Sequence, residues 1–342
     1  MENNKPLLQV EDLKIYFPLK KSLKDTINKV PTKYVRAVDG VSFSIEKGKT
    51  MGLVGESGCG KSTIGKSLVR LITPYAGHIY YDGQDITTFN EEQAHEYCKK
   101  IQYIFQDPYS SLNPKMTVLE TVRRPLDIFN LYDEADRNKR VLELLDMTGI
   151  AASQAQRYPH EFSGGQRQRI SIARALAVEP EFIVADEPTS ALDVSIQCQI
   201  LDLLTELRKE LGLTLLFISH DLSVVNYITE NVQVMYLGHM IEHGVTKEVF
   251  KNPKHPYSKA LLEALPKRGS TDTHRDIKLM GYIPSPINPP AGCLLHPRCP
   301  YAQQICADTV PEPCMIDGRE VCCHFAKKQN FSARTLPVTE AL

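Results

Sequence analysis

The sequence has no long apolar run, no excess charge of either sign and no secretion signal. Among its 342 residues, no apolar stretch approaches the roughly 20 residues of a membrane-spanning helix. The N-terminal segment 1–6 lacks the apolar core of a signal peptide. A formal net charge of −1 gives no global attraction to nucleic acid or anionic lipid. We therefore expect a cytosolic protein with no nucleic-acid partner, which reaches a membrane only through another subunit.

Cysteine is scarce over most of the chain and crowded at its end. The hydrophobic fraction of 42% and charged fraction of 24% are ordinary for a globular protein, and the length suits about two domains. Cys59, Cys98 and Cys198 are scattered over the first 290 residues. The other six are Cys293, Cys299, Cys306, Cys314, Cys322 and Cys323. In a reducing compartment, such a cluster is more typical of a metal site than of disulfides.

A glycine-rich segment between an apolar run and a helical pattern has the form G-x-x-x-x-G-K-[ST]. Strand-like residues 51–54 precede it, and the helical pattern begins at Ile64. Its backbone N–H groups and the helix N-terminus can bind a phosphate, Lys61 can reach the β- and γ-phosphates, and Ser62 can bind Mg²⁺. A turn that merely caps a helix is the alternative. The predicted phosphate-binding loop (P-loop) consists of Gly55, Glu56, Ser57, Gly58, Cys59, Gly60, Lys61, Ser62 and Thr63.

Two acidic residues follow the fully apolar run 182–185, which predicts a buried strand. Ligands of α/β sheets bind at the carboxyl ends of strands. Beside a P-loop, Asp186 is placed to hold Mg²⁺, directly or through water, and Glu187 to polarise the attacking water. Two solvated acids at a strand end are the alternative. His220 follows the next predicted strand, 213–218, where it could contact a γ-phosphate or be an ordinary surface histidine.

Coarse patterns outline the rest of the chain. We expect an edge strand over 7–17, a basic surface insertion over 18–33 and a strand over 35–45. Strands are also predicted at 79–81 and 101–105, and helices over 116–150. A further helix opens after Ser163, a plausible N-cap, and runs to Ala177. Tyr16 or Phe17 could stack on an adenine, although a core aromatic is an equal alternative.

Taken in order, these motifs resemble the ATP-binding-cassette (ABC) ATPases. The resemblance is continuous over 7–250 and adds Gln106, the segment Ser163–Gln166 and Ser190–Asp193 to the motifs above. It implies an α/β P-loop NTPase: a RecA-like core, an antiparallel β subdomain and a helical subdomain inserted at about 107–178. A cysteine-rich C-terminal extension over 251–330 would follow.

The resemblance also implies roles for individual residues. Tyr16 or Phe17 looks like the adenine-stacking aromatic, and Gln106 like the Q-loop glutamine that touches Mg²⁺ and relays to a transmembrane partner. Asp193 resembles the D-loop aspartate at the dimer interface, and His220 the switch histidine. The signature loop, which contacts the ATP bound on the opposing subunit, would be Ser163, Gly164, Gly165 and Gln166.

Three further segments resemble the oligopeptide/dipeptide permease ATPases: 107–114, 191–197 and 255–262. The resemblance implies a peripheral subunit at the cytoplasmic membrane face, paired with a paralogous ATPase on two transmembrane permease subunits. An extracytoplasmic peptide-binding protein would be an indirect partner. An ATPase contacts no cargo, so oligopeptides, dipeptides, nickel and other small solutes all stay open. A soluble ABC protein of translation or DNA repair is a further alternative, although such proteins usually carry two cassettes or a long coiled coil.

The C-terminal cysteines lack the C-x₂-C pairs usual in structural zinc sites. The region is rich in proline, shows few helix or strand signals and is too short to bury a core of its own, so a metal would supply folding energy. Four thiolates suit an iron–sulfur cluster, zinc is the second reading, and uncommitted thiols are the third. The permease resemblance implies a [4Fe–4S] cluster on Cys293, Cys299, Cys306 and Cys323, with Cys314 and Cys322 outside the pattern.

Overall fold

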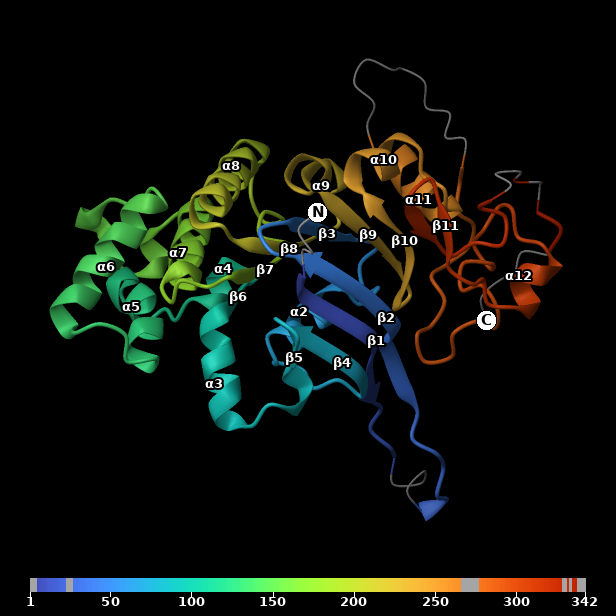
Figure 1. Cartoon of the computed structure of the whole chain (residues 1–342), viewed down its shortest axis with the longest axis horizontal. Helices are drawn as coiled ribbons and strands as arrows, with labels where there is room; N and C mark the ends of the chain where they lie inside the picture. The colour runs from blue at the N-terminus through green and yellow to red at the C-terminus, as the bar shows by residue number, and fades with distance from the viewer. Residues whose placement is uncertain (1–4, 23–26, 266–276, 328–330, 332–333, 337–342) are drawn as a thin grey trace.

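The computed structural model describes residues 5–22, 27–265, 277–327, 331 and 334–336. Residues 1–4 of the N-terminal segment and 23–26 of the predicted insertion lie outside these ranges, as do parts of the C-terminal extension. The chain forms two sheets, with a group of helices at one end and the C-terminal extension at the other (Figure 1).

The smaller sheet is antiparallel, in the order β2-β1-β4-β5. Its strands are β1 (Pro6–Pro18), β2 (Tyr34–Glu46), β4 (Ala76–Tyr81) and β5 (Gln84–Asp85). The prediction of an edge strand near the N-terminus was wrong, because β1 pairs on both sides: Leu8 faces Ile45 of β2 and Tyr81 of β4.

The larger sheet is mixed, in the order β11-β12-β10-β9-β3-β8-β7-β6. The strands β9, β3, β8, β7 and β6 are parallel to their neighbours in this run, whereas β10, β12 and β11 are antiparallel. The bounds are β3 (Thr50–Val54), β6 (Ile101–Ile104), β7 (Phe182–Asp186), β8 (Thr214–Ser219), β9 (Asn231–Tyr236), β10 (His239–Val245), β11 (Cys314–Ile316) and β12 (Arg319–Val321).

Helices cover both faces of the parallel strands. Beside the sheets lie α2 (Lys61–Leu68), α3 (Glu91–Lys100), α8 (Val194–Leu211), α9 (Leu222–Ile228) and α10 (Thr246–Lys251). The helical group at the end of the molecule (Figure 1) contains α4 (Pro108–Ser111), α5 (Val118–Ile128), α6 (Glu134–Met147) and α7 (Gly164–Leu176). Short 3₁₀ turns are η1 (Ile86–Thr88), η2 (Ala152–Gln154) and η3 (Pro159–Glu161).

Alternating residues of the parallel strands supply two hydrophobic cores. Val184 and Ile218 pack with Ile64 of α2 and with the small antiparallel sheet. Ile183 and Phe217 face the opposite way, into the core shared with the helical group. Burial on both faces explains why these strands read as continuous apolar runs in the sequence.

The C-terminal extension contains α11 (Pro256–Glu263), α12 (Gln304–Asp308) and the hairpin β11-β12. We predicted a region with few regular elements and no core of its own. The structure attaches it to the larger sheet, where β12 pairs with β10. Leu295, Cys299 and Ala302 are buried in the same hydrophobic core as the helical group. The extension therefore uses the core of the preceding domain.

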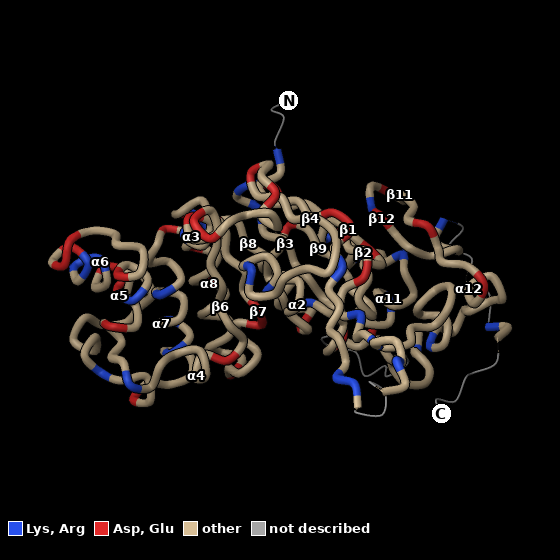
Figure 2. The backbone as a smooth tube through the Cα atoms, turned by 90° about the horizontal axis from the view of Figure 1, so that it is seen from below, with Lys and Arg blue, Asp and Glu red and all other residues tan. Residues whose placement is uncertain are grey.

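Charge is distributed evenly. Lysine and arginine are interspersed with aspartate and glutamate over the elements (Figure 2), which agrees with the small net charge of −1. None of the helices in the described part of the chain is both long enough and apolar enough to span a membrane.

Candidate nucleotide site

The predicted P-loop connects β3 to α2. Gly60 stands at the N-cap of α2 with φ of 108°, where a side chain would be strained and would collide with the carbonyl oxygen of Ala37. The buried Lys61 ammonium donates to the carbonyl oxygens of Gly55 and Glu56, at 2.8 and 3.1 Å. The lysine therefore lies folded against the loop that would receive a phosphate.

The other loop residues differ in exposure. Ser57 and Gly58 are exposed at the tip, whereas Ser62 and Thr63 are partly buried in the first turn of α2. Cys59 is buried, and burial raises the pKa of its thiol. A buried thiol with a raised pKa is a poor nucleophile, so Cys59 contributes packing.

Asp186 ends β7 and meets the P-loop directly. Its Oδ1 accepts a hydrogen bond from the Ser62 hydroxyl at 2.8 Å, which places two predicted Mg²⁺ ligands together. Its Oδ2 accepts from the buried Tyr103 hydroxyl at 2.6 Å. Burial, and next the Asp186 carboxylate, raise the pKa of Tyr103, so its hydroxyl stays a donor. Sequence reasoning missed Tyr103, because a tyrosine inside an apolar strand carries no signal of its own.

Glu187 lies next to the site with its backbone in the left-handed region, at φ of 46°. Its N–H donates to the carbonyl oxygen of Ile218, which fixes this unusual conformation between two strand ends. Its Oε2 accepts from the Gln106 amide at 2.9 Å, and Nδ1 of His220 lies 3.1 Å from the same oxygen. Three residues predicted from separate motifs therefore meet at one carboxylate.

The signature and D-loop segments lie apart from this group. Ser163 caps α7, with its hydroxyl accepting from the Gln166 N–H and the Gln166 side chain bonded back to the Ser163 N–H. Gly165 packs closely against Ile196 of α8, where a Cβ would not fit. Ser163 and Asp193 are exposed, and Gly164 is partly buried. Among the described residues, no hydrogen bond joins either segment to the P-loop.

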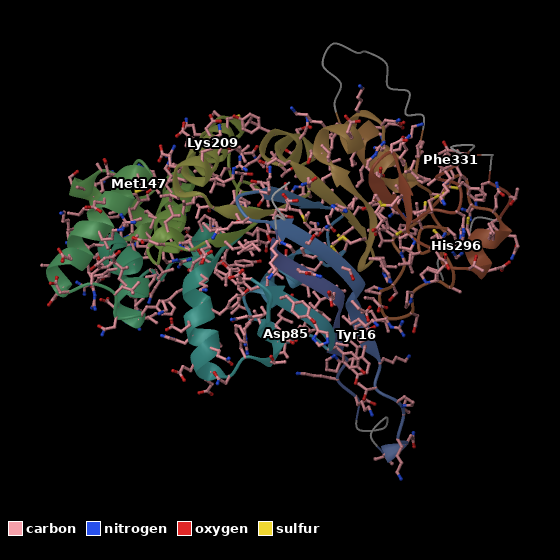
Figure 3. All side chains as sticks on the ribbon, viewed as in Figure 1. Tyr16, Asp85, Met147, Lys209, His296 and Phe331 are labelled. Carbon is pink, nitrogen blue, oxygen red and sulfur yellow. The ribbon has the colours of Figure 1, made fainter. Side chains whose placement is uncertain are left out.

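The two candidate aromatics lie in different environments. The Tyr16 ring stacks on Tyr75 at 4.7 Å between centroids, and its hydroxyl donates to Asp39 at 2.6 Å. Burial and this hydrogen bond raise the pKa of Tyr16 to about 12. Phe17 is 40% exposed and takes part in no ring stack in the described chain. Tyr16 is labelled among the side chains of Figure 3.

The four predicted ligand cysteines line one small apolar cavity in the extension, together with His296 and Phe331. Figure 3 shows sulfur atoms gathered between these two labelled residues. Burial raises the pKa of Cys293 and Cys299 to about 12 and that of Cys323 to about 11. All nine cysteines are free. Cys322 does not line the cavity, and the Cys314 thiol donates to the carbonyl oxygen of Val321 at 3.3 Å.

These thiols share a cavity, but they are not arranged as a finished coordination shell. In the described ranges, no group of three or more His, Cys, Asp or Glu residues has the geometry of a metal site. The donor set and the apolar surroundings suit a thiolate-bound metal, and the prediction of an iron–sulfur cluster finds no further support in the structure.

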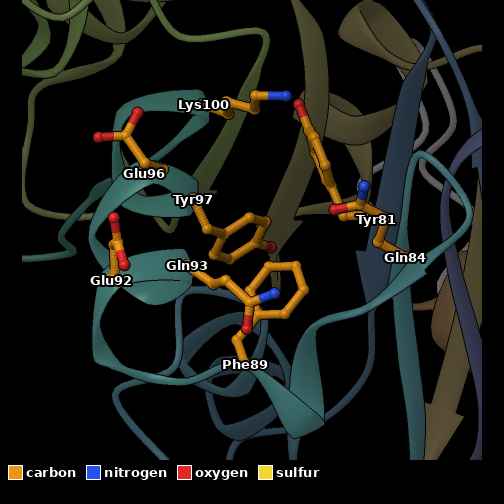
Figure 4. Close-up of a pocket in the computed structure, with 8 residues that line it drawn as sticks. All are labelled: Tyr81, Gln84, Phe89, Glu92, Gln93, Glu96, Tyr97 and Lys100. Carbon is orange, nitrogen blue, oxygen red and sulfur yellow. The ribbon is translucent and has the colours of Figure 1, made fainter.

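A separate pocket lies between α3 and the β4-β5 hairpin (Figure 4). It is lined by Tyr81, Phe89 and Tyr97, with Glu92, Glu96 and Lys100 around them. It contains none of the predicted site residues.

Comparison with known proteins agrees with the geometry. Residues 38–190 match the family model "ABC transporter", and residues 241–306 match "Oligopeptide/dipeptide transporter, C-terminal region". The oligopeptide transport ATP-binding protein AppF of Bacillus subtilis (strain 168) is 52% identical over 91% of this chain and 94% of its own length. The chain belongs to the ATP-binding subunits of the oligopeptide/dipeptide ABC transporters.

Other members of the family span almost the whole chain. The dipeptide transport ATP-binding protein DppF of Escherichia coli (strain K12) is 45% identical over 95% of this chain and 96% of its own. Among solved structures, the ATP-binding cassette MJ0796 in a dimeric post-hydrolysis state with ADP and Pi matches with a TM-score of 0.61 and 29% identity. It covers 70% of this chain and 98% of its own. The ABC cassette fold and ATPase activity predicted from the motifs are confirmed.

Proposed function

We propose that this chain hydrolyses ATP to power the import of oligopeptides or dipeptides through a membrane permease. The observation that carries the proposal is the hydrogen bond from Ser62 of the P-loop to Asp186, the residue before Glu187, in a chain that matches the C-terminal region of peptide transporters. The names of relatives matched over nearly their full length, AppF and DppF, support a peptide cargo.

The contacts support a separate role for each residue of the site. Lys61 would leave the loop carbonyls to bind the β- and γ-phosphates. Ser62, Asp186 and Gln106 would hold Mg²⁺, which would neutralise charge on the phosphates. Glu187 would orient the attacking water, and His220 and Gln106 would hold its carboxylate in place. Phe17, with its exposed ring, is the better candidate than Tyr16 for stacking on adenine.

The signature segment supports a site shared between two subunits. Ser163 is exposed and makes no bond to its own P-loop in the described chain, and the α7 N-terminus offers N–H groups to a phosphate. We infer that Ser163–Gln166 and Asp193 face the P-loop of a paralogous ATPase in a heterodimer on two permease subunits. That assembly would lie at the cytoplasmic face of the membrane, with the peptide-binding protein on the other side.

Two domains follow from this proposal. The ATPase domain would occupy 7–250, with its helical subdomain at about 107–178, and the extension 251–330. In the extension, Cys293, Cys299, Cys306 and Cys323 would hold a [4Fe–4S] cluster, with zinc as the alternative. The bound metal would act as a structural cross-link between segments far apart in the sequence.

The function is tested by affinity purification of the tagged chain from a membrane extract. We expect two multispanning membrane proteins and a second ATPase to copurify, and we expect the assembly to hydrolyse ATP. Lys61→Ala should assemble equally but lose tight ATP binding, since the ammonium is the main cation for the phosphates. Capture of soluble factors without membrane proteins would contradict the proposal. The ligand of the associated binding protein identifies the cargo and separates peptides from nickel.

A further inference from the structure

The P-loop is held from outside the ATPase core by the C-terminal extension. The Arg298 guanidinium donates to both carboxylate oxygens of Glu56, at 2.6 and 2.9 Å. The two residues lie 242 positions apart in sequence. Glu56 directly follows the first glycine of the loop, and its own carbonyl oxygen accepts from the Lys61 ammonium. Arg298 of the extension therefore bonds to the side chain of Glu56, whose backbone carbonyl holds Lys61.

Tyr257, also in the extension, makes a second contact to the same residue. The Glu56 N–H donates to the Tyr257 hydroxyl oxygen at 2.9 Å. The Tyr257 ring is completely buried and packs on Tyr236 of β9 at 4.8 Å between centroids. Both the backbone and the side chain of Glu56 are thus fixed by residues 257 and 298.

The arginine is held rigidly. Its side chain is 9% exposed, against 25% for Glu56, and its guanidinium lies over the Tyr236 ring at 5.7 Å. Its backbone is also fixed, because the Arg298 N–H donates to the carbonyl oxygen of Leu295 and the Arg298 carbonyl oxygen accepts from the Met280 N–H. A bidentate pair that is this well shielded from water is geometrically specific, and removing one partner leaves an uncompensated charge.

We propose that the extension is part of the nucleotide site, with Arg298 and Tyr257 as positioning residues that set P-loop conformation and charge. Glu56 places a carboxylate at the loop that receives the phosphates. Unpaired, this negative charge would repel ATP, and Arg298 neutralises it with a bidentate bond. The inference rests on the proposed function, in which this loop binds ATP.

A double-mutant cycle on the full chain tests the link. Arg298→Ala, Glu56→Gln and the double variant are titrated with MgATP in the Glu187→Gln background, so that hydrolysis does not interfere. We expect Arg298→Ala to weaken ATP binding about tenfold or more, because a carboxylate is left unpaired beside the phosphates. Adding Glu56→Gln should restore much of this loss, since no unpaired charge remains.

A control variant separates this role from general support of the fold. Arg319 also docks the extension, donating to the carbonyl oxygens of Glu248 and Asn252, but it makes no contact with the P-loop. Arg319→Ala should lower the unfolding temperature and leave the ATP affinity of the folded protein unchanged. Equal ATP affinities for Arg298→Ala and the parent, additive effects in the cycle, or an equal loss in Arg319→Ala would each overturn the proposal.

Tyr257→Phe keeps the test decisive if Arg298→Ala does not fold. It removes only the hydroxyl that accepts from the Glu56 N–H. We expect faster hydrogen exchange of the amides of residues 55–60 and weaker ATP binding by a few-fold. Unchanged exchange and affinity would contradict the inference. If the parent itself binds no ATP, the proposed function fails and the link to the extension is not the cause.

Discussion

The Gln106 amide donates to the Glu187 carboxylate at 2.9 Å, although the two residues follow different strands, β6 and β7, and lie 81 positions apart. His220 directly follows a third strand, β8, and its Nδ1 lies 3.1 Å from the same Glu187 oxygen. Gln106 and His220 are exposed, whereas the Glu187 side chain is only 13% exposed. The chain thus forms a polar group of three residues, in which the partly shielded Glu187 carboxylate is contacted by two exposed side chains.

Glu187→Gln is expected to keep ATP binding and lose turnover. The amide can still accept from Gln106, so the shape of the site is preserved, but it cannot act as a base toward water. We expect the hydrolysis rate of the assembled transporter to fall by ~10²–10⁴-fold, the usual contribution of a general base. Equilibrium binding of MgATP and single-turnover hydrolysis measure the two effects separately. Wild-type turnover in this variant would refute the role of Glu187.

Tyr103→Phe is expected to raise the Mg²⁺ requirement. The Tyr103 hydroxyl is the donor that orients Asp186 Oδ2. Loss of a partner that orients a metal ligand typically costs ~10–100-fold in metal affinity. We expect a rise of about tenfold in the Mg²⁺ concentration for half-maximal hydrolysis.

Tyr97→Phe is the matched control for this prediction. The Tyr97 hydroxyl is equally buried and donates to the carbonyl oxygen of Leu68 at 2.8 Å, away from Asp186. Its loss should cost stability of ~1 kcal/mol and leave the Mg²⁺ titration unchanged. Equal shifts of the Mg²⁺ curve in both variants would show that Tyr103 acts only through stability.

Residues at strand ends could be predicted because the sequence marks them twice. Asp186 follows a fully apolar run and begins a pair of acidic residues, and the P-loop carries its own spacing of glycines. The strand β7 and the bond from Ser62 to Asp186 agree with this prediction. The helical group over 116–150 was also visible, because its apolar residues recur at helical spacing.

Contacts between distant segments could not be predicted. Tyr103 and Arg298 reach the site from a strand interior and from the C-terminal extension, and neither stands in a pattern that specifies its partner. The interior position of β1 was missed for a related reason. Alternation shows that one face is buried, but strand order depends on pairing with β4, more than 60 residues away.

Phe17→Ala is expected to weaken ATP binding, and Tyr16→Ala is expected to leave it unchanged. The Phe17 ring is exposed and available, whereas Tyr16 is stacked on Tyr75. Stacking of a base on an aromatic ring is worth ~1–3 kcal/mol by alanine substitution, which corresponds to roughly 5- to 150-fold in affinity. Titrations with ATP and with inorganic triphosphate measure the effect, and the triphosphate should bind both variants equally. A loss of ATP binding confined to substitutions of Tyr16 would reverse the assignment.

Cys299→Ser is expected to abolish binding of the proposed metal in the extension and to lower the stability of the whole chain. Cys299 lines the cavity with the other three predicted ligands and is also buried in the main hydrophobic core. Loss of one thiolate ligand should therefore release the metal and weaken the packing of the extension on the larger sheet.

Iron, sulfide and zinc are measured in anaerobically purified protein, together with the unfolding temperature. Cys198→Ser is the control, because Cys198 is exposed on α8, outside the extension, and should change neither quantity. A colourless parent protein with stoichiometric zinc and no iron would replace the iron–sulfur cluster with a zinc site. A parent protein that contains no metal would reject both.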